Sequence, residues 1–329
     1  MIIDAHAHII VPEILRDAAP DEAWRPRVSV HDGQQVIEFG GKHIKSAVRE
    51  FVDINAILDE QDKSGVERVV LCPWVSLLRY DASPDEGRET CAIYNQALSS
   101  LAQKQAGRIS ALGMIPLQDP DLAAIELEAV MKLLGVGGVE IAASVNGVYL
   151  GDDRFESFWS AAEAIGALVF IHPTTRGFGE EVFSDYYLWN TVGNPLETTI
   201  AAAHLIMAGV MERHPGLKVL LAHGGGTILS LRGRLHHAHT FQPQARARLK
   251  ESPEESLRRF YFDTVTHDGG LLRSLVDFVG ADHVLLGSDY PFDMGVERPL
   301  EIVRQAGLAP SDEALILGGN AARLLGLEG

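Results

Sequence analysis

Two histidines separated by one residue stand near the start of the chain, in the stretch Ile2-Ile3-Asp4-Ala5-His6-Ala7-His8. In a regular β-strand alternate side chains point to one face. His6 and His8 would therefore project together, with Asp4 on the same face and the alanines on the other. Imidazole nitrogens paired in this way can bind one divalent cation, as in zinc sites. The pair could also be two solvated histidines at a loosely ordered chain end, so the motif alone does not decide.

Three more side chains that can bind a metal or carry a proton come at the end of an apolar run. They are His172, His223 and Asp289. Each has an ordinary explanation by itself, because His172 precedes a proline that can mark a turn and Asp289 can cap the following loop. Three such coincidences are jointly improbable, and we expect these residues to meet the histidine pair at one site.

Eight apolar runs alternate with helix-like segments along the chain. Besides the first run, they are Glu67–Cys72, Ile109–Met114, Gly138–Ile141, Leu168–Ile171, Lys218–Ala222, Phe260–Thr264 and Val284–Gly287. Continuous apolar character is typical of parallel strands covered on both faces, and strand–helix alternation indicates right-handed crossover connections. Eight such units predict an α/β fold, a (β/α)8 TIM barrel that forms one domain over residues 1–329. The carboxyl ends of its strands meet at one face, where barrel enzymes place their active sites.

Two stretches interrupt this alternation. Residues 12–41 are polar and contain Pro and Gly, which predicts an insertion over the barrel mouth after the first strand. A helix from about Asp53 to Lys63 is expected to follow it. Residues 235–256 show weak periodicity, which predicts a long excursion or a subunit contact. A helix is expected at the C-terminal end of the fold.

The composition excludes some partners and some kinds of site. With 28 Lys and Arg against 45 Asp and Glu, the formal charge of −17 argues against a nucleic-acid partner. No apolar run approaches the roughly 18 residues of a membrane span, and no basic segment leads into an apolar one, so we expect a cytoplasmic protein without a membrane partner. Cys72 and Cys91 are the two cysteines, too few for a disulfide framework or a thiolate site. Any metal must therefore be bound by His and carboxylate.

The other histidines and one carboxylate are weaker candidates. We expect solvated or capping roles for His204, His214, His267 and His283, although His267 follows the seventh run and is the only one of the four near the mouth. For His236, His237 and His239 we expect an exposed polar helix end rather than a second metal site. Glu140 ends the fourth run. It could bridge a second metal ion, or it could be a structural or substrate-orienting carboxylate.

These motifs together resemble the amidohydrolase superfamily, and within it the branch typified by aminocarboxymuconate-semialdehyde decarboxylase. The resemblance covers essentially the whole chain, from the opening Asp-x-His-x-His motif to Asn194–Ala201, Ala222–Gly226, Phe260–Asp263 and Leu285–Phe292. It implies that one Zn²⁺, or another divalent metal such as Mn²⁺, is held by His6, His8, His172 and Asp289. It also implies that His223 stands beside the metal-bound water as the acid/base residue, so that His223 and Asp289 are the catalytic pair.

The resemblance further implies arginines that bind a substrate carboxylate. Arg49 is the nearest match for one of them, and Arg176 is a second candidate. Arg234 or Arg232 would reach the site of a neighbouring subunit, which implies a homodimer. Residues 17–41 and 174–176 depart from the typical pattern, so we expect a substrate different from that of the namesake. The aromatic stretch 177–189 could line an apolar wall near the mouth, although such a cluster more often belongs to ordinary packing or to a subunit interface.

The sequence therefore predicts a metal-dependent, non-oxidative decarboxylase of a small unsaturated or aromatic-derived carboxylic acid. A metal-dependent hydrolase or hydratase acting on an amide, a lactone or a conjugated acid is the alternative, since the same residues suit both. Two metal ions bridged by Glu140 would favour hydrolysis, and one ion would favour decarboxylation or hydration. A non-enzymatic barrel ranks last, because every expected ligand position and His223 are filled.

Overall fold

A computed structural model describes residues 1–15, 22, 25–31, 34–39, 42–45, 49–174 and 180–327. Eight parallel strands form one sheet in the order β1-β5-β6-β7-β10-β11-β12-β13. They are β1 (Ile3–Ile9), β5 (Arg68–Pro73), β6 (Ile109–Gly113), β7 (Val136–Ala142), β10 (Leu168–His172), β11 (Lys218–Leu221), β12 (Tyr261–Asp263) and β13 (Val284–Leu285). Every predicted run is thus confirmed as a strand, with small differences at the ends.

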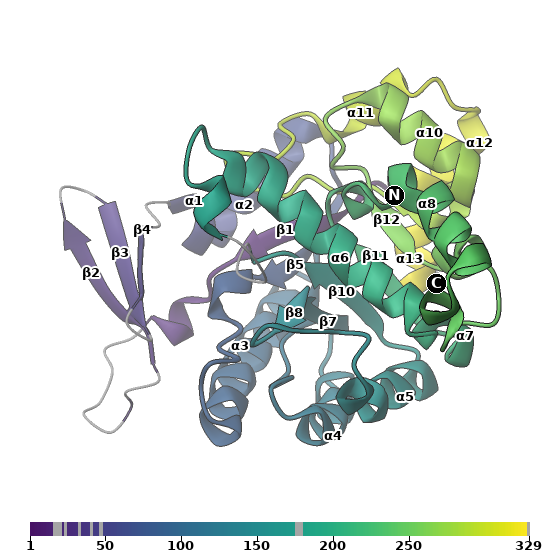
Figure 1. Ribbon diagram of the computed structural model, residues 1–329. Helices are drawn as coiled ribbons and strands as arrows, with labels where there is room; N and C mark the ends of the chain where they lie inside the picture. The colour runs from purple at the N-terminus through teal and green to yellow at the C-terminus, as the bar shows by residue number, and fades with distance from the viewer. Residues whose placement is uncertain are drawn as a thin grey trace.

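The sheet closes on itself between its first and last strands. The backbone N–H of Ala5 donates to Leu286 O at 2.8 Å, and that of His8 donates to Tyr290 O at 2.7 Å. A parallel bridge joins Ala7 to Tyr290. The predicted TIM barrel is therefore confirmed, with helices arranged around the strands (Figure 1).

Most helices cover the outside of the barrel. The longer ones are α2 (Ile54–Ser64), α3 (Pro84–Lys104), α4 (Pro120–Val130), α5 (Glu156–Ile165), α6 (Asn194–Met207), α8 (Ile228–Phe241), α10 (Gly269–Val279) and α11 (Pro299–Gln305). Shorter helices are α1 (Arg49–Val52), α7 (Val210–Arg213), α9 (Pro253–Leu257), α12 (Pro310–Ala314) and α13 (Asn320–Leu324). The helix expected after the insertion is α2, which begins where the Asp53 carboxylate accepts from Asn55 N. The expected C-terminal helix is α13.

The strand β1 is less regular than the sequence predicts. Its pairing with β5 shifts register between Asp4 and Ala7, which marks a β-bulge. Ala5 packs in the cluster that fills the barrel, with Phe170, while Ala7 packs in the outer core beneath the helices. The prediction that Asp4 shares a face with His6 and His8 is therefore wrong. The Asp4 carboxylate instead accepts a hydrogen bond from Gln61 of the outer helix α2.

The insertion after β1 contains a small sheet. Its three antiparallel strands are β2 (Arg27–His31), β3 (Gln34–Phe39) and β4 (Lys42–Lys45). In Figure 1 they project from the body of the molecule on the side toward which β1 runs. The insertion itself was expected, but its strands were not, because the polar composition of the segment and its Pro and Gly residues indicate loops. Two further short strands, β8 (Ser144–Val145) and β9 (Val148–Tyr149), form a hairpin after β7.

The stretch 235–256 is more ordered than the predicted excursion. The helix α8 runs through His236, His237 and His239 to Phe241, so the expected exposed helix end is present. It is followed by α9, which starts with a capping box formed by Ser252 and Glu255.

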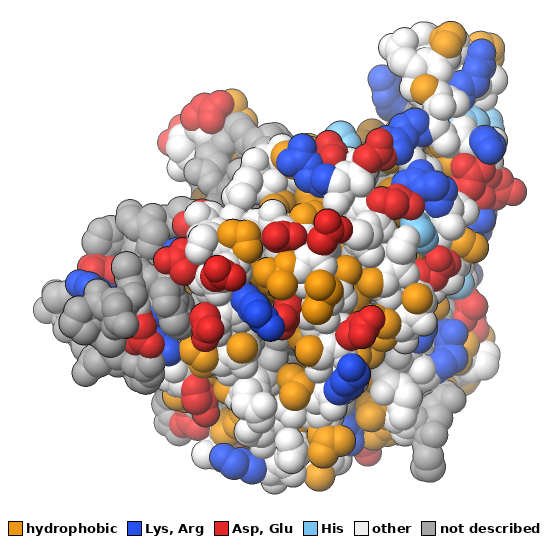
Figure 2. Space-filling view, turned by 90° about the horizontal axis from the view of Figure 1, so that it is seen from below, with side chains coloured by type: hydrophobic (Ala, Val, Ile, Leu, Met, Phe, Trp, Pro, Cys, Tyr) orange, Lys and Arg blue, Asp and Glu red, His pale blue; other side chains and the backbone are white. Residues whose placement is uncertain are grey.

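The face of the molecule seen from below in Figure 2 carries charged side chains of both signs. Figure 2 shows acidic and basic side chains interspersed with apolar ones on the face below α3, α4 and α5. Among the helices of the described residues, none combines the length and the apolar character that crossing a membrane requires.

Candidate metal centre and neighbouring cavities

Four ligand-type side chains converge where β1, β10 and the chain after β13 meet. The Nε2 atoms of His6 and His8 lie 3.0 Å apart. Asp289 Oδ1 lies 3.1 Å from His6 Nε2, 3.3 Å from His8 Nε2 and 3.8 Å from His172 Nε2. All four residues are buried. The structure therefore brings together every residue for which the resemblance implies a metal-ligand role.

The two carboxylate oxygens of Asp289 face different histidines. Oδ1 faces the three described above, whereas Oδ2 lies 3.3 Å from His223 Nε2. Donor atoms of His6, His172, His223 and Asp289 also lie within 4.8 Å of one another, so distance alone does not exclude His223 as a ligand. Its side chain is 13% exposed, against 0–5% for the other three histidines. His223 therefore stands at the open edge of the cluster.

The cluster has the features of a cation site. Among the described residues, the buried atoms Asp289 Oδ1 and His172 Nε2 make no hydrogen bond, which is rare in a folded protein unless a ligand supplies the partner. Two nitrogen ligands at about 2.1 Å from one tetrahedral Zn²⁺ lie roughly 3.4 Å apart. The distances of 3.0–3.3 Å among His6 Nε2, His8 Nε2 and Asp289 Oδ1 are close to this value. Imidazole and carboxylate donors suit a divalent transition metal. The residues present therefore fit one cation.

The outer ring nitrogens of the three inner histidines are each fixed by an oxygen. His6 Nδ1 lies 2.7 Å from Asp263 Oδ2, and His8 Nδ1 lies 2.8 Å from Pro73 O. His172 Nδ1 lies 2.9 Å from Pro173 O. A hydrogen bond to Nδ1 fixes the tautomer and turns Nε2 toward the metal, as in known histidine–metal sites.

Charge is distributed unevenly over the cluster. Burial disfavours the imidazolium form, but Asp289 and Asp263 outweigh it and raise the pKa of His6 to about 10. Burial lowers the pKa of His172 to about 3 and also lowers that of His8. Burial would raise the pKa of Asp289, but His6, His172 and His223 hold it well below its usual range. A histidine binds a metal only as the neutral imidazole, so a protonated His6 would have to lose its proton first.

Glu140 lies behind the cluster. Its Oε2 is 3.8 Å from His8 Nδ1, the ring nitrogen that points away from the other ligands. Both carboxylate oxygens are buried without a hydrogen bond among the described residues, and burial raises the pKa of the group well above its usual range. This position does not favour a bridge between two ions at the Nε2 side. Neither of the two mouth cavities described next is lined by Glu140.

A cavity of about 230 Å³ opens beside His223 and Asp289. Its apolar lining residues are Pro195, Leu229, Val265, Leu271, Leu275 and Met294. His267 also lines it, although the sequence predicted only a solvated or capping role for this residue. The signal that could have found His267 is its position four residues after β12, at the carboxyl end of a barrel strand.

Among the predicted arginines whose side chains the structure describes, none lines this cavity. Arg49 begins α1, but its side chain and the whole of Arg176 lie outside the described residues. Arg234 is exposed on α8 and does not line the cavity, and the guanidinium of Arg232 lies over the Phe278 ring. Sequence reasoning missed Arg79. This buried residue lines a second cavity of about 220 Å³ beyond the ends of β5, β7 and β10.

The aromatic stretch 177–189 does not line the 230 Å³ cavity through its described residues, 180–189. Tyr186 is 91% exposed. Tyr187 donates its hydroxyl to Asp293, and burial together with this carboxylate raises the pKa of Tyr187 to about 12. Of the alternatives for this stretch, the Tyr187 contact supports packing, here against the loop after β13. The cavity is lined by the neighbouring Asn190 and Thr191.

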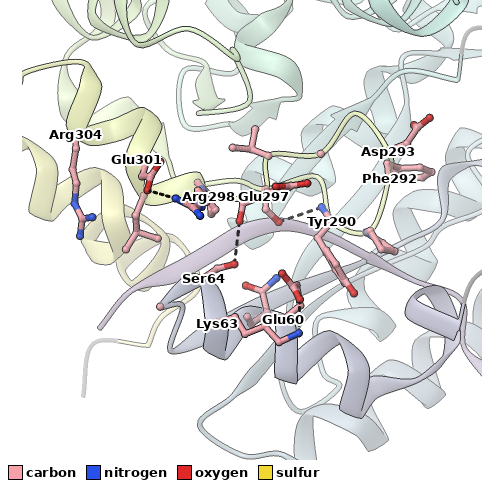
Figure 3. A pocket seen from close by; sticks show the side chains of 18 residues that line it. Glu60, Lys63, Ser64, Tyr290, Phe292, Asp293, Glu297, Arg298, Glu301 and Arg304 are labelled. Atoms are coloured by element: carbon pink, nitrogen blue, oxygen red, sulfur yellow. Dashed lines mark hydrogen bonds and ion pairs between the residues drawn. The ribbon is translucent and has the colours of Figure 1, made fainter.

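A larger cavity of about 840 Å³ lies on the other side of the loop that carries Asp289 (Figure 3). Figure 3 shows Lys63 and Ser64 of α2 on one wall and Arg298 and Glu301 on the other. Within this loop, Asp289 and Met294 line the smaller cavity, while Tyr290, Phe292 and Asp293 line the larger one. One loop therefore separates the candidate site from an outer, charged cavity.

Asp4 fastens this loop to β1. Its carboxylate accepts hydrogen bonds from Ser288 N at 3.1 Å and from the Ser288 hydroxyl. It also accepts from His6 N at 3.0 Å and from Gln61 at 3.1 Å. Asp4 is thus not a ligand of the cluster but positions two of its members.

Two of the motifs that carry the resemblance, Ala222–Gly226 and Asn194–Ala201, contain residues that the local structure requires. The residues 223–226 all have positive φ, and a Cβ at Gly226 would lie 2.0 Å from Pro195 O, so only glycine fits there. Glu197 of α6 accepts from Thr174 N at 2.6 Å and so holds the chain that follows His172. The segments around α6 and β11 therefore shape the mouth.

Comparisons with known proteins agree with this architecture. A family model described as Amidohydrolase matches residues 76–327. The 2-amino-3-carboxymuconate-6-semialdehyde decarboxylase of Dictyostelium discoideum is 31% identical over 290 residues, covering 88% of this chain and 80% of the relative. The gamma-resorcylate decarboxylase of a Polaromonas species is 25% identical over 346 residues, with 97% of each chain covered.

A solved structure supports the same fold. The dihydroxybenzoic acid decarboxylase of a Polaromonas species, crystallised with manganese and the inhibitor 2-nitroresorcinol, superimposes with a TM-score of 0.81 at 22% identity. The match covers 100% of this chain and 97% of the other. At that identity the likeness establishes the barrel, and the chemistry must be argued from the residues.

Proposed function

This chain belongs to the amidohydrolase family, and on that premise we propose that it is a metal-dependent, non-oxidative decarboxylase of a small aromatic or unsaturated carboxylic acid. The observation that carries the proposal is the division of labour at Asp289. One of its oxygens faces three histidines that fit a cation, and the other faces a histidine at the edge of a cavity. Several relatives are named as decarboxylases of such acids.

The proposed metal ligands are His6, His8, His172 and Asp289. When bound, Zn²⁺ or Mn²⁺ supplies Lewis-acid chemistry, polarising an oxygen substituent of the substrate or a water molecule. The manganese of the Polaromonas structure supports a divalent ion of this type. The position of Glu140 on the outer side of His8 favours one ion over two.

His223 is the proposed acid/base residue. Its Nε2 lies against Asp289 Oδ2, while its Nδ1 is buried without a hydrogen bond among the described residues. In the reaction the bond between the ring carbon and the carboxylate breaks, carbon dioxide leaves, and the electron pair stays on the carbon. The imidazolium of His223 donates a proton to that carbon and regains one from water. Asp289 Oδ2, 3.3 Å from His223 Nε2, orients the ring for the transfer.

The cavity beside His223 suits a substrate with one ring or an equivalent chain. Its apolar residues Leu229, Val265 and Met294 can pack on a flat carbon skeleton, and His267 offers a polar group. Arg49 and Arg176 remain our proposed carboxylate-binding residues. A contribution of Arg234 to a partner's site in a homodimer would account for its exposure on α8.

A direct assay tests the proposal. The purified protein would be stripped with a chelator, reloaded with Zn²⁺ or Mn²⁺, and incubated with 2,6-dihydroxybenzoate or 2-amino-3-carboxymuconate semialdehyde. We expect carbon dioxide release only from the reloaded protein, with one ion per chain by elemental analysis. Hydrolysis of a lactone or an amide without release of carbon dioxide from either acid would overturn the proposal in favour of a hydrolase.

A further inference from the structure

One buried carboxylate contacts both halves of the candidate site. Asp263, the last residue of β12, has 0% exposure. Its Oδ2 lies 2.7 Å from His6 Nδ1 and accepts from His223 N at 2.9 Å. Its Oδ1 accepts from Gly224 N at 2.7 Å and from Val265 N at 3.1 Å. Each oxygen of this carboxylate therefore receives two donors.

The backbone at His223 needs such support. Its φ is +56°, a left-handed conformation in which a side chain with a Cβ costs about 1 kcal/mol or more. Gly224 follows with φ +58°, so two consecutive N–H groups turn toward the Asp263 carboxylate. This arrangement is a backbone anion site filled by a side chain of the same protein. The Asp263 carboxylate therefore fixes the backbone position from which the His223 side chain projects.

We propose that Asp263 is a positioning residue that couples the metal ligand His6 to the acid/base residue His223 through one shared oxygen. The inference rests on the proposed function for the roles of these two histidines. Asp263 is not one of the proposed metal ligands, but its carboxylate contacts both histidines. At His6 the carboxylate fixes the tautomer and strengthens the donor, and at His223 it holds the backbone in its left-handed turn.

An amide cannot replace this carboxylate. Asparagine has the same shape but presents one oxygen and one NH₂ group. In either orientation the NH₂ would meet N–H donors, either those of His6 and His223 or those of Gly224 and Val265. A buried donor facing a donor loses its hydrogen bond and costs about 1–3 kcal/mol. Asp263→Asn should therefore affect both histidines, because one orientation removes their acceptor and the other replaces a carboxylate oxygen by a neutral amide oxygen, which accepts more weakly.

The first measurement needs no substrate. The affinity of the metal-stripped protein for Mn²⁺ and Zn²⁺ would be measured by competition with a chelator, for the wild type and Asp263→Asn. We expect a loss of about 10–100-fold, the usual cost of removing the partner of a ligating histidine. The matched control is Asp268→Asn, the same change five residues later at the N-cap of α10, where Asn caps equally well. It should leave metal affinity unchanged.

The second measurement separates positioning from metal loss. At saturating metal, kcat of Asp263→Asn should remain at least 10-fold below wild type, with KM changed less than threefold, because His223 is misplaced. In the Zn²⁺ form labelled with ¹⁵N-histidine, the hydrogen-bonded Nδ1 proton of His6 should shift or disappear in Asp263→Asn only. A variant that was damaged only in its overall fold would lower its melting temperature without this selective change.

The outcomes decide the proposal separately from the function. Metal affinity and kcat within twofold of the Asp268→Asn control would overturn it. If Asp263→Asn does not fold, Asp263→Glu keeps the charge but moves the carboxylate by about one bond length. Wild-type metal affinity together with wild-type kcat in that variant would likewise overturn it. The wild type could release no carbon dioxide from any acid while Asp263→Asn still weakens metal binding and alters the His6 signal. In that case the proposed function is wrong, and the proposed positioning of His6 by Asp263 is supported.

Discussion

The buried His214 and the histidine cluster at the barrel mouth have opposite hydrogen-bonding states. His214, on the outer layer, has both ring nitrogens occupied, with Nδ1 2.9 Å from Glu163 and Nε2 2.9 Å from Glu156. At the barrel mouth, His172 Nε2 and Asp289 Oδ1 are buried without a hydrogen bond among the described residues. The first group is complete as it stands, whereas the second lacks a partner.

The difference shows what separates a structural histidine from a candidate ligand. Burial and nearby carboxylates are common to both groups, so neither property identifies a site. The unsatisfied atoms and the position beyond strand ends do. Four mutational and pH predictions test this comparison, from the largest expected effect to the smallest.

Removal of Asp289 should have the largest effect. Asp289→Ala deletes the oxygen that faces three histidines, so we expect bound metal to fall below about one tenth of wild type and decarboxylation to become undetectable. The control is Asp293→Ala in the same loop, whose carboxylate contacts the Tyr187 hydroxyl instead. Elemental analysis and carbon dioxide release are the measurements. Full metal occupancy in Asp289→Ala would show that this carboxylate is not a ligand.

His223→Ala should separate chemistry from metal binding. Because His223 faces the other oxygen of Asp289, we expect the metal content to stay near wild type while kcat falls by about 10²–10⁴-fold, the usual contribution of an acid/base residue. The metal content and kcat would be measured on the same preparation. Parallel loss of the metal would mean that His223 belongs to the ligand set.

His214→Ala should change stability without changing activity. The substitution leaves two glutamates without their shared partner, and we expect the free energy of unfolding to fall by about 1–3 kcal/mol, measured by urea denaturation. Metal content and kcat should match wild type. A loss of metal in this variant would erase the distinction between the two groups.

The smallest expected effect is on how the stability of the protein falls at low pH. The Arg213 guanidinium and His214 hold the pKa of Glu156 below its usual value, and the Gly216 backbone and His214 do the same for Glu163. Groups with a lowered pKa in the folded state stabilise it above the unfolded value of 4.5 and lose this contribution as the pH falls through the folded pKa. Urea titrations between pH 3 and 6 should therefore show a shallower acid loss of stability in His214→Ala than in wild type. An unchanged slope would assign the lowered pKa values to Arg213 and Gly216 alone.

Much of this picture could be predicted from the sequence, for a physical reason. Parallel barrel strands are buried on both faces, so they form continuous apolar runs, and His172 and His223 stand out where those runs end. The contact between His6 and Asp289 followed from closure of the barrel.

Other features have no local signature. The bulge that turns Asp4 outward depends on how β1 pairs with its neighbour. Asp263 ends a strand whose sequence contributed to the resemblance, yet its two-sided role depends on the backbone of residues 223–226, which the sequence does not specify. Arg79 lies in a loop whose course is set by tertiary packing. Hydrogen bonds between distant segments are the part of the site that residue types and spacing did not reveal.

The clip between Asp4 and Ser288 joins residues that are 284 positions apart. During synthesis the first strand leaves the ribosome long before its final neighbour exists. His6 and His8 are therefore synthesised long before Asp289, and the candidate site cannot be complete until the segment after β13 has emerged. A nascent chain that ends before β13 contains seven of the eight barrel strands and lacks Asp289. The candidate metal site can therefore be completed only late in synthesis.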